Sequence, residues 1–437
     1  MNGFEIIKKV AEESRQELVA CRRDFHKHAE TGWYEMRTSS IIARKLTDMG
    51  YEVLTGEDVC DREARMGVPS EEELEKGYQR AIEQGADPEF VERTRGGMTG
   101  VIGILRCGEG PTVAMRFDID ALGVFESDEP DHKPKAEGFA SVNYGSMHAC
   151  GHDGHGTIGL GVAKALMAVR DQLHGTVRLI FQPAEEGVRG AKAIVAKGHL
   201  DNVDYFISGH LSGRSADNNA HFVANSYGAL ATCKYDAVYH GLAAHAGGVP
   251  NAGKNAMLAA CTAVLNLQAI PRHAGGATRI NVGRLIAGSG RNVICDEAKL
   301  ELEVRGENAQ LNTYMSEYAE RILKAAADMH DCTVDIKLMG SAIPLKSDVD
   351  FAQHLRTVVE EKMGLIHDAR ESFRSAGSED VSYMMQRVQE QGGKAVFMRQ
   401  LTPMAGPAHN RRYDFNEDVL VTATQIYAAC VLDLLSK

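Results

Sequence analysis

Apolar residues recur at helical spacing through the first part of the chain. One stripe comprises Ile6, Ile7, Val10, Leu18 and Phe25, and a second comprises Ile41, Ile42, Leu46 and Met49 and stops at Gly50. This spacing predicts that residues 1–50 are mainly helical. Residues 56–98 are richer in Glu, Arg and Gly, and Ser70 followed by Glu73 predicts a capping box that opens a helix. We expect this insert to be a mostly solvated helical segment, either surface decoration or a substrate-side or partner-side element.

β-rich runs alternate with helical stretches further along the chain. Strands are predicted at 99–105, 112–117, 177–181, 203–207 and 395–398, and helices at 156–173 and 419–435. The first two strands flank a Cys-Gly-Glu-Gly-Pro turn and are predicted to form a hairpin. The alternation favours an α/β domain built on a sheet.

Residues 226–340 form a separate block. Strands are predicted at 231–239, 279–286, 298–304 and 333–338, and helices at 255–269 and 313–329. Their β-α-β-β-α-β order predicts a small ferredoxin-like sandwich. We therefore expect one domain made of residues 1–225 and 341–437, which carries the 56–98 helical insert, and a second domain of residues 226–340 inserted into it.

Composition excludes several classes of partner. The chain has 437 residues, enough for two or three domains, and its 48 Lys and Arg against 60 Asp and Glu give a net charge of −12. An acidic chain without a Lys/Arg run argues against binding nucleic acid or anionic lipid. No apolar stretch approaches the roughly 18 residues of a membrane span. The first residues have no long apolar core and no small-residue cleavage site, so we do not expect export. The nine scattered cysteines contain no C-x-x-C pair, which favours the reducing cytoplasm.

The densest group of potential metal ligands lies at residues 147–155, Met-His-Ala-Cys-Gly-His-Asp-Gly-His. Cys150 and His152 are two residues apart, so both can reach one site from a turn or an extended segment. Thiolate and neutral imidazole suit Zn²⁺, Mn²⁺ or a similar cation. The alternative is a glycine turn before the 156–173 helix with incidental histidines.

Further candidates follow predicted strands, where the ligand crevice of an α/β sheet lies. Glu185 and Glu186 follow the 177–181 strand, and adjacent carboxylates project differently, so one can bind a metal while the other acts as a base. His210 and His409 also follow strands, although a lone histidine in such a place is usually structural. Asp120 belongs to an Asp-Ile-Asp run after another strand, and one of these carboxylates can orient a ligand histidine from behind.

Together these runs resemble the dinuclear metallopeptidase and amidohydrolase family that includes carboxypeptidase G, aminoacylases, hippurate hydrolases and indoleacetyl-amino-acid hydrolases. The resemblance rests on RRDFHKHAETGWYEMRTS, RFDIDAL, MHACGHDGHG, FQPAEEG, HAG-P-GKNA, GSGRNVI and GSED, which span roughly residues 22–416. It implies a zinc-peptidase-like catalytic domain with a central mixed sheet and an inserted ferredoxin-like α+β lid or dimerisation domain. The 56–98 insert resembles the branch of the family that acts on p-aminobenzoyl-glutamate.

The resemblance also implies roles for individual residues. The implied metal ligands are Cys150, His152, Glu186, His210 and His409. Glu185 is implied as the general base and Asp120 as a catalytic aspartate beside the metals. His245 is implied to polarise the scissile carbonyl in the active site of the partner chain. Asn292 and Arg305 are implied to hold the substrate carboxylate, a task that suits the planar fork of arginine.

The implied activity is hydrolysis of an N-acyl amino acid, with p-aminobenzoyl-glutamate, a folate breakdown product, as the favoured substrate. Alternatives are an aminoacylase or hippurate-type hydrolase for other acyl groups, or a non-catalytic partner subunit, although a scaffold has no need of both ligands and a base. Two divalent metal ions are implied per subunit, Mn²⁺ favoured over Zn²⁺. The implied assembly is a homodimer or a heterodimer with a homologous B subunit.

Overall fold

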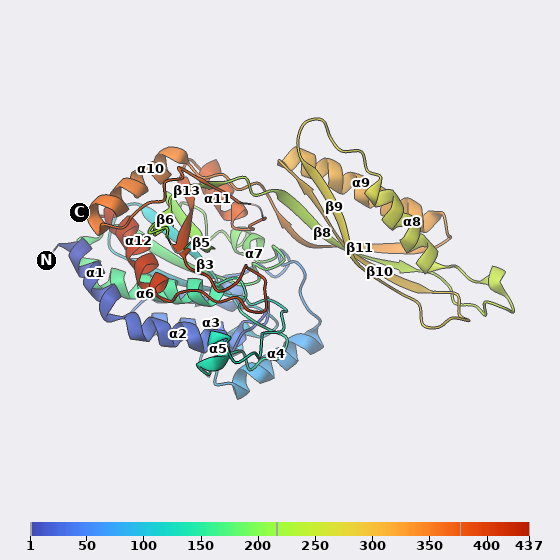
Figure 1. The fold of residues 1–437 in the computed structure, drawn as a ribbon, viewed down its shortest axis with the longest axis horizontal. Helices are drawn as coiled ribbons and strands as arrows, with labels where there is room; N and C mark the ends of the chain where they lie inside the picture. The colour runs from blue at the N-terminus through green and yellow to red at the C-terminus, as the bar shows by residue number, and fades with distance from the viewer. Residues whose placement is uncertain (1, 216, 376, 437) are drawn as a thin grey trace. The chain divides into compact units, whose positions relative to one another are not determined.

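The computed structural model of the chain describes residues 2–215, 217–375 and 377–436. The chain folds into two compact units (Figure 1). Unit 1 comprises Met1–Tyr227, Lys346–Ser375 and Asp380–Lys437, and unit 2 comprises Gly228–Leu345 and Ala376–Glu379.

Unit 1 is built on a seven-stranded sheet with the order β1-β2-β4-β3-β5-β13-β6. These strands are β1 (Glu52–Thr55), β2 (Val101–Arg106), β3 (Thr112–Asp118), β4 (Thr176–Gln182), β5 (Tyr205–Gly213), β6 (Phe222–Val223) and β13 (Lys394–Thr402). β4, β3, β5 and β13 pair in parallel, whereas β1, β2 and β6 join in antiparallel fashion. The expected central mixed sheet is therefore confirmed. A short pair, β7 (Ser226–Tyr227) and β12 (Phe373–Arg374), lies outside it.

The predicted hairpin between the second and third strands is wrong. β4 lies between β2 and β3, antiparallel to the first and parallel to the second. The turn bonds to the start of β4 instead of closing on itself, because Cys107 N donates to Gly175 O and Thr176 N donates to Pro111 O. β4 is apolar along most of its length, so a central position with a partner on each side buries it best.

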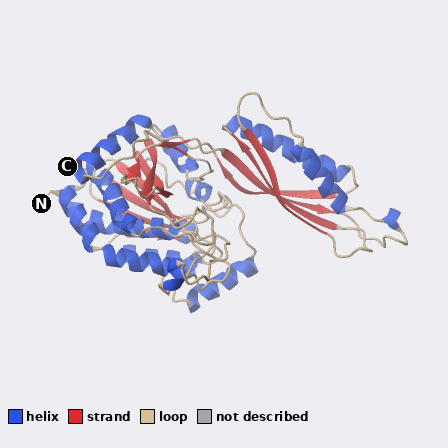
Figure 2. Ribbon diagram, in the orientation of Figure 1, coloured by secondary structure: helices blue, strands red, loops and turns tan. Residues whose placement is uncertain are grey.

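Helices enclose the sheet of unit 1 (Figure 2). They are α1 (Gly3–Glu13), α2 (Arg15–Lys27), α3 (Met36–Asp48), α4 (Glu71–Glu83), α5 (Lys133–Ala136), α6 (His152–Ala168), α7 (Ala191–Ala196), α10 (Val349–Val358), α11 (Ser382–Glu390) and α12 (Asp418–Leu434). The mainly helical N-terminal segment is confirmed by α1, α2 and α3. None of the described helices is long and apolar enough to cross a lipid bilayer.

Helix α6 begins four residues earlier than predicted, at His152, and ends at Ala168. It is buried along almost its whole length, and its glycines allow close packing on the sheet. A Cβ at Gly159 would lie 2.7 Å from Phe181 and 2.8 Å from Phe117, closer than real contacts allow. The metal-ligand motif therefore spans the start of a buried helix, since Cys150 lies in the bend just before it and His152 is its first residue.

The 56–98 insert contains the predicted capped helix. In α4, Ser70 Oγ accepts from Glu73 N at 3.3 Å, and the Glu73 carboxylate accepts from Ser70 N at 3.0 Å. The helix buries Leu74 and Tyr78, and Trp33 Nε1 donates to Met66 O at 2.8 Å. The insert is thus packed on unit 1 and is less solvated than its composition suggests.

Unit 2 has the ferredoxin-like arrangement expected for the inserted block. Its elements are β8 (Ala231–His240), α8 (Ala256–Gln268), β9 (Thr278–Ala287), β10 (Glu297–Gly306), α9 (Ala309–Asp328) and β11 (Thr333–Ala342). The four strands form an antiparallel sheet in the order β11-β8-β10-β9. Ala298, Leu300, Leu302 and Val304 alternate along β10 and bury one face of the strand, which is the periodicity of a sheet covered on one side.

Candidate metal centre

The predicted ligands come from segments that the parallel strands bring to one edge of the sheet. Asp120 follows β3, Glu185 and Glu186 follow β4, and His409 lies in the loop after β13. His210 lies within β5, which extends to Gly213, so its predicted place beyond the strand is wrong. Because parallel strands end at the same edge, residues distant in sequence meet there.

Six of these residues form three overlapping groups. The groups are Cys150, His152 and His210; His152, Glu185 and Glu186; and Cys150, Glu186 and His409. Within each group, one donor atom per residue lies within 4.8 Å of the others. The structure therefore brings together the five predicted ligands and the predicted base.

Both buried histidines present Nε2 to this cluster. His152 Nδ1 lies 3.2 Å from Asp120 Oδ1, and His210 Nδ1 lies 2.6 Å from Leu211 O. Since both partners are acceptors, each Nδ1 carries a proton and each Nε2 is directed at the cluster. His210 Nε2 lies 3.3 Å from Cys150 Sγ, and His152 Nε2 is buried without a hydrogen-bond partner among the described residues.

This donor set fits a divalent cation. A buried imidazole nitrogen without a partner is costly, and a cation at Nε2 would satisfy it. Burial and the neighbouring Glu186 carboxylate raise the pKa of the Cys150 thiol. Burial lowers the pKa of His210, which keeps its imidazole neutral. A cation would thus displace the Cys150 proton and bind at ring nitrogens that already point at it.

Asp120 links the base, a ligand loop and a ligand histidine. Its Oδ1 accepts from Glu185 N at 3.1 Å, and its Oδ2 accepts from Glu186 N at 2.9 Å. Oδ1 also faces His152 Nδ1. In this geometry Asp120 orients other groups, which agrees with the expectation that a carboxylate of the Asp-Ile-Asp run lies behind a ligand histidine.

A second buried pair, formed by residues of the same two sequence motifs, supports the strand that carries His210. His155 Nδ1 is hydrogen-bonded to Asp118, while His155 Nε2 accepts from Leu211 N at 2.9 Å. Although Asp118, His152 and His155 also form a group of metal-ligating type, both nitrogens of His155 are engaged within the protein. His155 therefore fixes the backbone beside His210.

The insert contacts the loop that bears the two glutamates. Arg189 Nε donates to Glu186 O at 2.8 Å, and the Arg189 guanidinium donates to Gly67 O at 3.1 Å. One guanidinium thus joins the insert to the backbone of a predicted ligand. This contact favours a site-side role for the insert over surface decoration.

The remaining predicted residues belong to unit 2. His245 is exposed, and its Nδ1 accepts from Gly247 N at 3.1 Å and Gly248 N at 2.9 Å. Its Nε2 therefore carries the proton and is a donor. Asn292 lies beside it, because Ala246 N donates to Asn292 O at 3.0 Å.

Arg305 lies elsewhere in unit 2, near the end of β10. In the sheet register Glu297 lies opposite His240, whereas Arg305 lies opposite Thr232. Eight residues of strand span about 26 Å at roughly 3.3 Å each. The Arg305 guanidinium is paired with Glu303 at 2.9 and 3.1 Å. Unit 2 thus brings His245 and Asn292 together and holds Arg305 apart from them.

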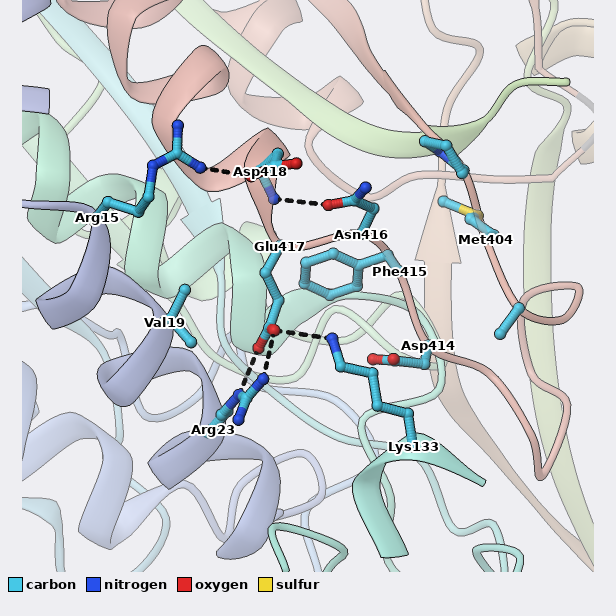
Figure 3. Close-up of a pocket in the computed structure, with 12 residues that line it drawn as sticks. Arg15, Val19, Arg23, Lys133, Met404, Asp414, Phe415, Asn416, Glu417 and Asp418 are labelled. Atoms are coloured by element: carbon cyan, nitrogen blue, oxygen red, sulfur yellow. Dashed lines mark hydrogen bonds and ion pairs between the residues drawn. The ribbon is translucent and has the colours of Figure 1, made fainter. Parts of the chain in front are cut away.

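A cavity of about 680 Å³ in unit 1 contains none of the predicted site residues (Figure 3). It is lined by Arg15, Val19, Arg23, Lys133, Pro403, Met404, Ala405, Asp414, Phe415, Asn416, Glu417 and Asp418. Glu417 accepts from Arg23 at 2.7 and 2.8 Å and from Lys133 at 2.8 Å, and Arg15 pairs with Asp418. The lining has three cations, Arg15, Arg23 and Lys133, and three carboxylates, Asp414, Glu417 and Asp418, so the cavity offers no net charge to a ligand.

Comparisons with known proteins agree with this site. Residues 114–433 match the sequence profile of Peptidase family M20/M25/M40. The chain is 43% identical to indole-3-acetyl-aspartic acid hydrolase of Enterobacter agglomerans over 95% of both chains. It is 42% identical to the A subunit of p-aminobenzoyl-glutamate hydrolase of Escherichia coli (strain K12) over 94% of both. The aminobenzoyl-glutamate utilization protein of Klebsiella pneumoniae has the same fold, with a TM-score of 0.83, 37% identity and 98% of both chains covered. The chain therefore belongs to peptidase family M20/M25/M40, whose members act as hydrolases on amide bonds.

Proposed function

We propose that this chain hydrolyses the amide bond of an N-acyl amino acid, with p-aminobenzoyl-glutamate as the preferred substrate and p-aminobenzoate and glutamate as products. The observation that carries the proposal is the convergence of Glu185 with five Cys, His and Glu donors at one sheet edge. The two relatives named for their substrates both act on an aromatic acyl group joined to an acidic amino acid. Indoleacetyl-aspartate and hippurate-type substrates are the alternatives.

Cys150, His152, Glu186, His210 and His409 would hold two divalent metal ions, with Mn²⁺ favoured and Zn²⁺ as the alternative. Two ions are supported by the overlap of the donor groups, since Cys150, His152 and Glu186 each belong to more than one. When bound, the ions would polarise the scissile carbonyl and lower the pKa of water.

Glu185 would serve as the general base. It takes a proton from the attacking water as the new C–O bond forms, and it returns a proton to the amide nitrogen as the C–N bond breaks. Its backbone is fixed by Asp120, which supports a precise position for the carboxylate. Because Asp120 is also hydrogen-bonded to His152, it would fix the position of the base relative to a metal ligand.

Substrate recognition would involve unit 2. His245 Nε2–H would donate to the scissile carbonyl oxygen, and Asn292 and Arg305 would bind the substrate carboxylate. A substrate of two-residue length spans only about 7 Å, far less than the roughly 26 Å between the two ends of β10. His245 and Asn292 of one chain would therefore serve a different active site from Arg305 of the same chain, which supports the action of His245 in the partner chain.

The assembly would be a dimer of lid domains. In this proposal residues 1–225 and 341–437 form the catalytic domain, and residues 226–340 form the lid or dimerisation domain. Leu258 and Leu265 of α8 are 50% and 74% exposed, and Leu285 and Ile286 of the edge strand β9 are 41% and 49% exposed. An apolar helix beside an unpaired strand edge is typical of a protein interface. The partner would be a second copy or a homologous B subunit.

The compartment would be the cytoplasm, where the environment is reducing. This rests on the nine cysteines, which are all free thiols in the structure.

A hydrolysis panel tests the proposal. The purified chain would be stripped of metal, reloaded with Mn²⁺ or Zn²⁺, and assayed on p-aminobenzoyl-glutamate, indoleacetyl-aspartate and hippurate. p-Aminobenzoyl-glutamine is the matched control, because it lacks only the side-chain carboxylate. We expect metal-dependent release of p-aminobenzoate, fastest for the glutamate substrate. Absence of hydrolysis by the folded, metal-loaded dimer or heterodimer would favour a non-catalytic role instead.

A further inference from the structure

The segment between β4 and α7 carries Glu185 and Glu186 in an irregular conformation. Ala184 and Val188 have φ values of 50° and 59°, in the left-handed region that residues with a side chain rarely adopt. Such a conformation persists only where the surroundings impose it. The hydrogen-bond partners of this segment therefore identify the residues that impose its conformation.

Asp380 ties together the two ends of the segment. Its side chain is buried, and its Oδ2 accepts from Gly190 N at 3.0 Å and from Ala191 N at 2.9 Å. Its Oδ1 accepts from Gln182 Nε2 at 2.9 Å, and Arg116 lies 3.4 Å away. One carboxylate thus joins the last residue of β4 to the first residue of α7.

Glu35 holds the residue immediately before the proposed base. Its side chain is fully buried, and one oxygen accepts from Ala184 N at 2.7 Å. The other oxygen accepts from Thr99 Oγ1 at 2.7 Å. Asp120 accepts from the two residues that follow Ala184. Three buried carboxyl groups therefore accept from five backbone amides of one segment, those of Ala184, Glu185, Glu186, Gly190 and Ala191.

We propose that Glu35 and Asp380 are positioning residues that hold the 182–191 segment in the conformation that places Glu185 for catalysis. This inference rests on the proposed function, because it assumes that Glu185 is the base. The hydrogen bonds that these buried carboxyl oxygens accept from Ala184 N, Gly190 N and Ala191 N hold the strained backbone in place, and leaving such buried amides without an acceptor is costly. A displacement of about 1 Å at a reacting group can cost about 10²-fold in rate, so these bonds act on kcat.

The two amide variants have different consequences. Each group that contacts Asp380 donates a hydrogen, so the NH₂ of Asp380→Asn faces a donor whichever way it turns. Glu35→Gln keeps an oxygen for Ala184 N, and its NH₂ can donate to the Thr99 hydroxyl, which is able to accept. The Asp380 variant should therefore be the more damaging one.

Matched controls exist for both positions. Asp348 accepts from Ala395 N and Gln389 Nε2, each at 2.9 Å, which is the same pair of donor types outside the segment. Buried Glu30 accepts from Arg37 N at 3.0 Å and Thr38 N at 2.8 Å.

The four metal-loaded variants would be compared in kcat and KM. For Asp380→Asn we expect kcat to fall by about ten- to a hundredfold with KM within about threefold, and for Glu35→Gln a loss of a few fold. Asp348→Asn and Glu30→Gln should stay within about twofold of wild type. If Asp380→Asn matches Asp348→Asn, the positioning role is wrong.

A double mutant separates positioning from a general loss of structure. If Asp380 acts through Glu185, adding Asp380→Asn to Glu185→Gln should cost less than about threefold, because the base is already lost. A full, additive loss would overturn the inference. Hydrogen exchange of the metal-loaded protein gives a readout apart from activity, and it should quicken in 183–191 alone. Unchanged exchange there would also overturn it.

The outcomes distinguish this inference from the proposed function. If wild type is inactive on the whole panel, or Glu185→Gln keeps full activity, the proposed function fails while the exchange measurement still tests the segment. If Asp380→Asn does not fold, Glu35→Ala replaces it in the same measurements, with Glu30→Ala as its control. Glu35→Ala removes the acceptor for Ala184 N without introducing a donor.

Discussion

Mixing two inactive variants tests whether His245 acts across a dimer interface. The perturbation is an equimolar mixture of Glu185→Ala and His245→Ala chains, exchanged in mild denaturant or co-expressed with two different tags. In a hybrid dimer, the intact Glu185 of one chain would meet the intact His245 of the other. The opposite site would lack both groups.

The expected magnitude follows from this geometry. Loss of a general base costs about 10²–10⁴-fold, and loss of one oxyanion donor costs about 10²–10³-fold. Each variant alone should therefore retain about 1% of wild-type activity or less. Random pairing places about half of the dimers in the hybrid form, with one good site of two, so about a quarter of wild-type activity should return. That is about 25-fold above the better single variant.

The assay is release of p-aminobenzoate by the mixture and by hybrids isolated with both tags. Isolated hybrids should reach about half of wild-type activity per dimer, and mixing two preparations of the same variant is the control. Verified hybrid dimers without recovered activity would show that His245 acts within its own chain or not at all. If the natural partner is a homologous B subunit, the same mixture is made in the heterodimer.

Four further outcomes are expected. Glu185→Gln should lower kcat by about 10²–10⁴-fold with unchanged metal content by mass spectrometry, and more than a tenth of wild-type kcat would contradict its role as base. Cys150→Ser should weaken metal binding in a chelator competition, and chelation should reversibly inactivate wild type; a demetallated chain that kept its rate would refute the metal-dependent mechanism. Burial alone would raise the pKa of Glu417, but its bonds to Arg23 and other cations outweigh burial and lower it from 4.5 to about 2. Because the folded pKa is the lower one, this carboxylate stabilises the fold above about pH 4.5 and ceases to do so as the pH falls through 2, so the difference in unfolding free energy between wild type and Glu417→Gln should shrink between pH 5 and 2 in urea titrations. A difference that stayed constant over that range would contradict the ion-pair assignment. Leu265→Glu on the exposed face of α8 should shift the dimer towards monomer in sedimentation velocity, and an unchanged dimer would place the interface elsewhere.

Local patterns in the sequence were sufficient for much of the secondary structure. The Ser70–Glu73 capping box is formed as predicted, because a cap depends on residues within one helical turn. The alternating apolar positions of β10 and the element order of unit 2 likewise match a ferredoxin-like sheet. Hydrophobic periodicity is a local property of the sequence, so it predicts an element without knowledge of the segments that pack against it.

The pairing of the strands could not be predicted from local sequence patterns in the same way. The predicted hairpin between β2 and β3 failed because β4, about 60 residues further along the chain, lies between them. A short turn favours a hairpin locally, but burying the apolar β4 on both edges decides the order. The same limit explains His210, whose strand continues to Gly213 because it pairs with β13 along its whole length.

The chemistry of this protein can be read from the amino-acid order alone: the Cys, His and Glu residues able to bind a metal, their place after strands, and the resemblance that joins them. The folded chain was needed to decide which nitrogen of His152 and of His210 faces the cluster, because the position of the ring proton depends on the acceptor at the other nitrogen. The fold also revealed that Glu35 and Asp380 hold the loop of Glu185, although neither adjoins it in sequence. Residue types determine which groups can bind a metal, whereas their orientation depends on acceptors that the fold brings to them, from the adjacent Leu211 for His210 to Asp120, 32 residues before His152.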